Sequence, residues 1–202
     1  MSRARLNSTA LQRKNLLING NFDVWQRNTS LSAGTGNRFC ADRWGTYSIG
    51  TTLAPSQQAF TTGQTIVPNN PEYFHRTVVS SVTGSGNYGN FAQPIENVAT
   101  TSGKTLTLSF WAKANTLKNI AVEFVQNFGT GGSPSAQVTG IGVTTCILTS
   151  VWQKYTITTT LPSISGKTLG TNNDDYLAVT FWFDAGSTFN SRTNSLGRQS
   201  GT

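Results

Sequence analysis

The stretch Thr105-Leu-Thr-Leu-Ser-Phe-Trp-Ala112 decides the fold class. Apolar residues occupy its even positions from Leu106 to Ala112, and Thr, Ser and Trp lie between them. Because successive side chains of a strand point to opposite faces, this alternation predicts a strand half-buried against a core. Residues 120–126, 138–148 and 152–160 also predict strands, and the apolar run at 176–183 predicts a strand covered on both faces.

The amino-acid composition agrees with an all-β fold. Only 11% of the 202 residues are charged, and 10% are aromatic. The abundant Thr, Ser, Asn and Gly disfavour helices and suit short strands joined by polar turns. Less regular sequence predicts short strands at 22–25, 47–49, 66–67 and 73–82, and loops at 28–40 and 128–135. Together these features favour an antiparallel β-sandwich or barrel.

The positive charge is concentrated at the N-terminus. The net charge is +7, and the first 14 residues contain Arg3, Arg5, Arg13 and Lys14 but no acidic residue. We interpret residues 1–14 as a basic arm and residues 15–202 as the domain. The bases of the domain form no run interleaved with aromatics, so we expect no nucleic-acid partner. The start has no apolar signal core and no stretch reaches transmembrane length, so we expect neither export by a signal peptide nor membrane insertion.

The sequence nominates no catalytic residue. His75 is the one histidine, and neither Cys40 nor Cys146 has a metal-type neighbour, so zinc sites and histidine-based catalysis are disfavoured. We expect both cysteines to be free and buried, with a disulfide as the alternative. Glycosidase chemistry needs two carboxylates, and a pair such as Glu96 and Glu123 is open to that role.

Two polar loop stretches are candidates for ligands. In residues 84–90, Asn87, Tyr88 and Asn90 combine a stacking ring with hydrogen-bonding amides, as sugar contacts require, although an ordinary turn is the simpler interpretation. Phe128, at the start of the 128–135 loop, is a weaker sugar-binding candidate. Asp174 and Asp175 end an Asn- and Asp-rich turn whose oxygens suit calcium, with a solvated turn as the alternative.

Several motifs resemble phage tail-fibre and minor virion proteins. These are Asn15-Leu-Leu-Ile-Asn-Gly-Asn-Phe-Asp-Val-Trp-Gln-Arg27 with Ala41-Asp-Arg-Trp44, Ser109-Phe-Trp-Ala-Lys113, residues 125–135 and residues 176–186. The start, Met1-Ser-Arg-Ala-Arg5, is similar to short virion-attachment arms. The resemblance implies a virion protein that is made in the host cytoplasm, docks on other virion proteins through its arm, and forms a homotrimer.

A looser likeness is to jelly-roll carbohydrate-binding modules. It rests on Asn19-Gly-Asn-Phe-Asp23, Phe110-Trp-Ala-Lys113 and Trp152-Gln-Lys-Tyr155. It implies a jelly-roll-type antiparallel β-sandwich and a structural calcium near Asp23, with no other cofactor. Members end with a strand that pairs near the N-terminal one, and this sequence reaches Gly201-Thr202 without it. Either the chain is a fragment or that strand comes from elsewhere.

The sequence therefore predicts a non-enzymatic tail-fibre module that binds host-surface glycan. A purely structural virion decoration or adaptor, docked through the arm, is the alternative. Polysaccharide hydrolysis is a distant third.

Overall fold

A computed structural model describes residues 15–202, which form nine strands and three short helical turns. The strands are β1 (Gly34–Phe39), β2 (Gly45–Ala59), β3 (Tyr73–Ser80), β4 (Tyr88–Glu96), β5 (Thr105–Ala112), β6 (Lys118–Asn127), β7 (Val138–Leu148), β8 (Gln153–Thr160) and β9 (Tyr176–Ala185). The turns are η1 (Val98–Thr101), η2 (Ser187–Phe189) and α2 (Asn190–Thr193). None of these described helices is long and apolar enough to cross a membrane.

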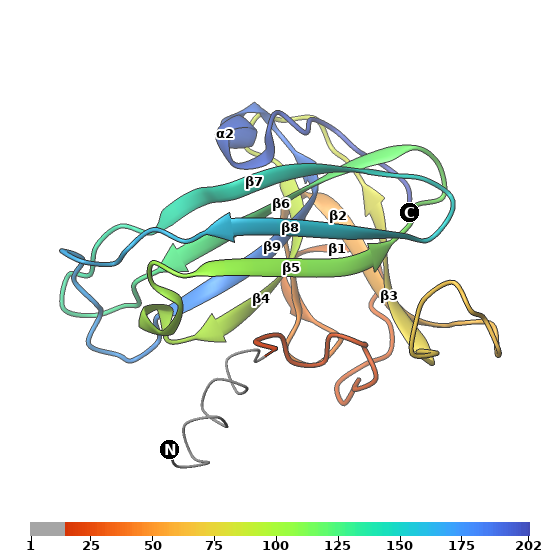
Figure 1. The fold of residues 1–202 in the computed structure, drawn as a ribbon. Coiled ribbons are helices and arrows are strands. Elements are labelled where there is room, and N and C mark those ends of the chain that lie inside the picture. The colour runs from red at the N-terminus through yellow and green to blue at the C-terminus, as the bar shows by residue number, and fades with distance from the viewer. Residues whose placement is uncertain (1–14) are drawn as a thin grey trace, which may run out of the picture.

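The strands form two antiparallel sheets of very different size. The larger sheet has the order β1-β2-β4-β9-β6-β7, and β3 pairs with β2 outside this path. The smaller sheet contains β5 and β8 alone. In Figure 1 these two strands cross in front of the larger sheet as a second layer. The predicted all-β, antiparallel β-sandwich is confirmed, with one layer covering only part of the other.

The long strand β2 changes partner along its length. Residues 45–49 pair with β4, and residues 52–59 pair with β3. Between the two halves, Gly50 has a φ of 69°, which glycine adopts without steric cost. A Cβ at Gly50 would collide with the side-chain amide of Asn87. Glycine is therefore required where β2 passes from one partner strand to the other.

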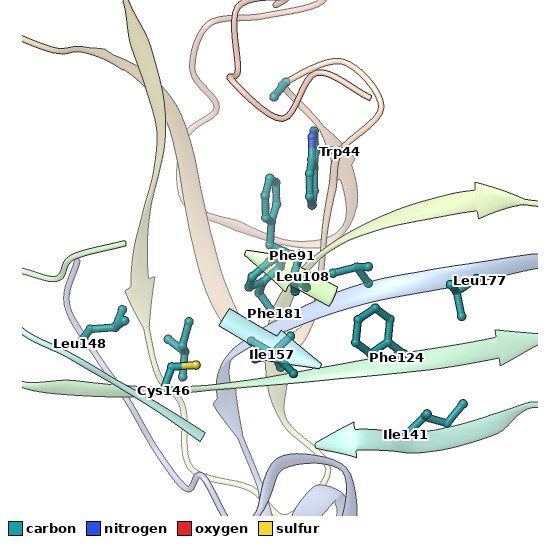
Figure 2. Close-up of a cluster of buried hydrophobic side chains, with 14 of the residues drawn as sticks. Trp44, Phe91, Leu108, Phe124, Ile141, Cys146, Leu148, Ile157, Leu177 and Phe181 are labelled. Carbon is teal, nitrogen blue, oxygen red and sulfur yellow. The ribbon is translucent and has the colours of Figure 1, made fainter. Parts of the chain in front are cut away.

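The core lies between the two layers. Leu108 and Ile157, paired across β5 and β8, point inward onto Phe91, Phe124 and Phe181 of the larger sheet. Figure 2 shows these side chains together. Each such buried side chain stabilises the fold by about 1.5–3 kcal/mol. The alternation predicted for β5 is confirmed, because its other even-numbered apolar residues also pack against this core.

The outward face of the small sheet is polar and regularly paired. Thr105 and Thr107 hydrogen-bond across the strands to Thr160 and Thr158, with Oγ1–Oγ1 distances of 2.8 and 3.0 Å. Cross-strand threonine pairs of this kind help to hold two strands in register.

The C-terminal segment covers the outer face of the larger sheet. Trp182, Ala121, Ala185 and Leu196 form a second, smaller buried cluster there. Glu123 is fully buried on this face. It accepts hydrogen bonds from Trp182 Nε1 at 2.9 Å, from the Arg192 guanidinium and from the Gly140 amide. These donors compensate for removing the Glu123 carboxylate from water.

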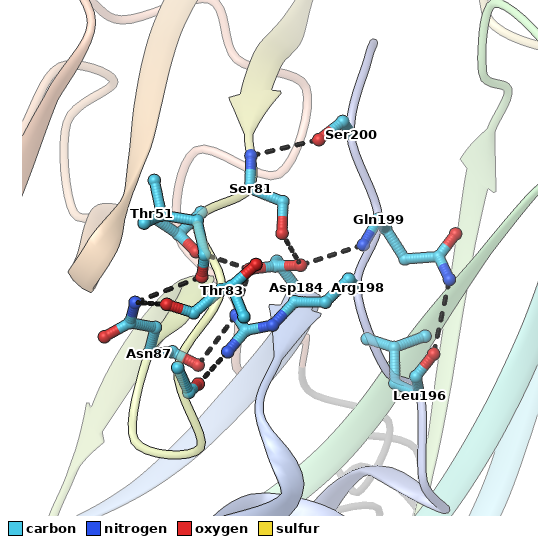
Figure 3. Close-up of polar contacts among 11 residues, drawn as sticks. Thr51, Ser81, Thr83, Asn87, Asp184, Leu196, Arg198, Gln199 and Ser200 are labelled. Carbon is cyan, nitrogen blue, oxygen red and sulfur yellow. Dashed lines mark hydrogen bonds and ion pairs between the residues drawn. The ribbon is translucent and has the colours of Figure 1, made fainter.

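A second buried carboxylate, Asp184, joins four separate segments. It is fully buried and accepts hydrogen bonds from Thr51 on β2 and from Ser81 after β3. On the C-terminal segment, Arg198 Nη1 donates to it at 2.7 Å and the Gln199 amide at 2.8 Å. Figure 3 shows these contacts converging on Asp184. The Arg198 guanidinium also donates to the Gly84 and Asn87 carbonyls, which fixes the β3–β4 loop.

Several local predictions were wrong. Residues 28–40 contain strand β1, an edge strand with two glycines that is held by pairing with β2. Residues 22–25 form no strand, because the Asn19 side chain hydrogen-bonds both backbone groups of Val24. Residues 66–67 form no strand, and strand β4, starting at Tyr88, was missed. The prediction that Cys40 and Cys146 are free and buried is confirmed.

Replacing Asp184 with Asn should destabilise the fold by about 3 kcal/mol or more, because Arg198 loses its buried counter-charge. Urea denaturation followed by tryptophan fluorescence measures this change. The exposed Asp23→Asn variant is the control and should stay within about 0.5 kcal/mol of the wild type. Equal stability of the two variants would contradict the role assigned to Asp184.

Candidate functional site

A large groove opens beside β5. It runs between the free edge of β5 on one side and β3 with residues 15–22 on the other, and has a volume of about 1430 Å³. We call it the β5 groove. Its apolar lining includes Phe22, Phe91, Leu106, Phe110, Trp152 and Phe183. The groove exists because the two-stranded sheet is too narrow to cover the inner face of the larger sheet.

His75 on β3 forms part of the groove wall within an aromatic stack. Its ring lies 4.0 Å from the Phe91 ring centroid and 5.8 Å from that of Trp25, nearly parallel to both. His75 Nε2 lies 2.8 Å from Thr77 Oγ1, and Nδ1 is buried with no hydrogen-bond partner. Desolvation in this setting lowers the pKa of His75 to about 3. The imidazole is therefore neutral near pH 7 and acts as a packing residue.

A second, polar hollow of about 550 Å³ lies where the end of β4 meets the start of β9. We call it the polar hollow. Its lining comes from four parts of the chain: Gln26 and Arg27; Phe39, Ala41, Asp42 and Arg43; Pro94 and Glu96; and Asn173, Asp174, Asp175 and Tyr176. The β1–β2 turn reaches this point because β1 and the first half of β2 extend the same sheet beside β4.

Three carboxylates of the polar hollow are held by their own hydrogen bonds. Asp174 accepts from the Thr130 amide at 2.7 Å and from Thr130 Oγ1 at 2.6 Å, and these bonds lower the pKa of Asp174. Asp175 accepts from the Val98 amide at 2.8 Å. Asp42 accepts from the Gln26 amide at 3.1 Å. Each carboxylate has further lone pairs available, so these side chains are acceptors fixed in position before a ligand arrives.

Two aromatic rings flank these acceptors. Phe39 is 41% exposed, although Arg27 lies over its ring at 5.3 Å. Tyr176 is half-buried, and burial together with the nearby Asp174 charge raises the pKa of its phenol. Arg43 and Glu96 form an exposed ion pair at 3.1 Å on the rim. The polar hollow therefore combines a partly exposed aromatic ring with carboxylate, amide and guanidinium groups.

A glycine allows the ring of Phe39 to lie where it does. A Cβ on Gly45 would approach Phe39 Cε1 and Tyr47 Oη to 2.9 Å, closer than packed atoms allow. The two rings meet edge to face over Gly45, with centroids 6.2 Å apart. Because Gly45 has no side chain, the Phe39 ring can pack directly against β2 beside the polar hollow.

The four residues predicted to contact sugar line neither the groove nor the polar hollow. Asn87 hydrogen-bonds the Val82 and Thr83 carbonyls, and Tyr88 packs against Trp182. Asn90 is buried on β4, and Phe128 is 1% exposed, so its ring offers no face to a ligand. The structure thus gives all four residues a part in packing or in holding a loop. A direct role in sugar binding stays a prediction for them.

The calcium candidates do not gather at one point. Among residues 15–202, no three His, Cys, Asp or Glu side chains come together as a metal-binding group. Asp23 lies exposed in the N-terminal turns, whereas Asp174 and Asp175 line the polar hollow. The three side chains therefore do not fit one shared calcium site, and calcium binding at any of them stays a prediction.

The remaining sequence candidates are also separated. Arg3, Arg5, Arg13 and Lys14 lie outside the described residues. Glu96 lies on the rim of the polar hollow, whereas Glu123 is buried and held by Arg192, so the two cannot flank one sugar as a catalytic pair. Sequence reasoning identified Asp174 and Asp175 as a polar turn. It did not identify Phe39, Asp42 or Arg43, which reach the polar hollow only through folding.

The chain resembles known proteins only distantly. No family model matches the chain, and no curated protein sequence matches it. A solved structure described as "CBM4 structure and function" is similar over 82% of this chain and 86% of its own, with 23% sequence identity and a TM-score of 0.41. CBM4 denotes a carbohydrate-binding module.

The low pKa of His75 predicts acid destabilisation. Because the folded state keeps the imidazole neutral down to about pH 3, whereas the unfolded chain binds a proton near pH 6.5, its contribution to stability is complete above pH 6.5 and is lost toward pH 3. The slope is at most about 1.4 kcal/mol per pH unit. The unfolding free energy of the wild type minus that of His75→Phe, measured from pH 7 to 4, should decrease as the pH falls. Parallel curves would contradict a buried neutral histidine.

Proposed function

We propose that this chain is a non-catalytic glycan-binding module and that the polar hollow holds the sugar. One observation carries the proposal: the partly exposed ring of Phe39 lines the same hollow as three anchored carboxylates, Asp42, Asp174 and Asp175. A pyranose ring has apolar C–H faces and a rim of hydroxyl groups. It therefore needs a flat apolar surface next to fixed hydrogen-bond acceptors. The volume of about 550 Å³ lies within the range typical of small-molecule sites.

The state of Asp174 supports binding without hydrolysis. A glycosidase needs one carboxyl group whose pKa is raised, so that it can protonate the leaving oxygen. The Thr130 hydrogen bonds move the pKa of Asp174 in the opposite direction. An ionised Asp174 accepts hydrogen bonds from sugar hydroxyls, which is the role of a binding residue.

We further propose that the ligand is a host-surface glycan and that the protein is a phage tail-fibre-type virion component. The sequence resemblance of residues 15–27, 41–44 and 109–113 supports this assignment. In this proposal the basic residues of the arm dock on another virion protein, and the module assembles as a trimer. The alternative is an adaptor that is incorporated through residues 1–14 and binds no glycan.

Phe39→Ala should weaken glycan binding by about tenfold or more, because the stacking surface is lost while the partly exposed site tolerates a smaller side chain. The measurement is binding to an array of bacterial surface polysaccharides, followed by titration calorimetry with the best ligand. Asn173→Ala should also weaken binding, and Ile49→Ala, which is 58% exposed and does not line the polar hollow, should not.

No binding by the wild type would favour the adaptor. Wild-type affinity in Phe39→Ala would show that the polar hollow is not the site. Release of reducing ends from the bound polysaccharide would identify a hydrolase instead.

A further inference from the structure

The small sheet has an open edge along β5. All eight residues of β5 pair with β8 on one side, from Thr105 with Thr160 to Ala112 with Gln153. On the other side β5 has no strand partner among residues 15–202. Such an edge presents unpaired N–H and C=O groups in the spacing that a further strand would match. That edge faces the β5 groove.

The floor of the β5 groove suits the alternating side chains of a strand. Leu106 and Phe110 on β5, together with Phe183 on β9, are only partly buried although they pack against the core. A strand lying beside β5 would direct every second side chain onto these residues and the others toward solvent. Eight residues of strand span about 27 Å, the length of β5 itself. The open volume of the β5 groove thus borders both the small sheet and the larger sheet.

The charged side chains that line the β5 groove indicate which kind of polypeptide segment would bind there. The titratable cations lining the β5 groove are Arg76, Lys113 and Lys118, and no Asp or Glu lies among its lining residues. Lys113 stands 5.4 Å from the Trp152 ring and Lys118 donates to the Ser200 carbonyl, so neither lysine has a carboxylate partner here. The chain's own residues 1–14 carry four bases and no acid, which these cations disfavour.

We propose that the β5 groove accepts an extended segment of a partner polypeptide as the third strand of the small sheet. The segment carries apolar side chains at alternate positions and acidic residues at its ends. Main-chain hydrogen bonds to β5 supply affinity, and the apolar floor selects the alternating pattern, as in other cases of strand addition. This site is separate from the polar hollow and does not depend on the proposed glycan function.

The test uses the full chain and the fluorescein-labelled peptide Glu-Phe-Thr-Val-Thr-Ile-Thr-Leu-Glu-Glu in fluorescence anisotropy. We expect saturable binding, and at least tenfold weaker binding of a peptide of the same composition with its apolar residues contiguous. Two further peptides are N-methylated, one at the apolar residues and one at the threonines. Because alternate N–H groups of a strand point to opposite sides, one of these should bind at least about tenfold worse than the other.

A charge reversal locates the site. Lys113→Glu should weaken binding of the acidic-ended peptide by about fivefold or more, and a peptide ending in lysines should recover it. Lys154→Glu, on β8 away from the groove lining, is the matched control and should bind as the wild type does.

The following outcomes would overturn the proposal. They are equal binding of both N-methylated peptides, no binding of any peptide, and displacement of the peptide by a soluble glycan. A large gain in affinity on deleting residues 1–14 would identify the arm as the occupant. Dimerisation of the full chain that is lost on adding peptide would identify a second copy.

Discussion

Every layer of the molecule is packed against β9, and the need to bury both faces of this strand organises the rest. β9 pairs with β4 on one side and β6 on the other, so it lies at the centre of the larger sheet. Its inner residues, Leu177 and Val179, require the small sheet as a cover. Its outer residues, Trp182 and Asp184, require the C-terminal segment. Because β9 is buried on both faces, each face needs a covering layer. The hydrogen bonds and ion pairs of Glu123 and Asp184 hold the outer layer, the C-terminal segment, in place.

The same arrangement creates both candidate sites. The inner cover is only two strands wide, which leaves the β5 groove beside it. The polar hollow lies at the edge where β4 ends and β9 begins. Beyond the last paired residues of these strands, turns from distant parts of the chain come together and their side chains line the hollow. Strand geometry separates the two sites: Ile95 lines the groove, whereas its neighbours Pro94 and Glu96 line the polar hollow on the other face.

The sequence predicts the strands whose burial pattern is visible in their own residues. It misses the strands that form because of contacts with distant parts of the chain. β5, β8 and β9 carry their pattern in their own residues. β4 does not: Gly89 is needed because a Cβ there would lie 2.9 Å from Leu53 Cδ2, and Gln93 is buried because its amide pairs with both backbone groups of Ile18. The polar hollow was missed for the same reason, since Phe39 and Asp42 meet Asp174 only after β1, β2 and β9 have assembled. Asn87 and Tyr88 look like ligand contacts in sequence because loop packing uses the same residue types.

The alternation of β4 has one more consequence. This strand is a wall shared by two sites, because Phe91 and Ile95 line the groove whereas Pro94 and Glu96 line the polar hollow. A ligand that displaced β4 at one site would therefore move residues that line the other. Any such coupling would be reciprocal: a bound strand that raised the affinity for the ligand of the polar hollow would itself be held more tightly by that ligand, by the same factor.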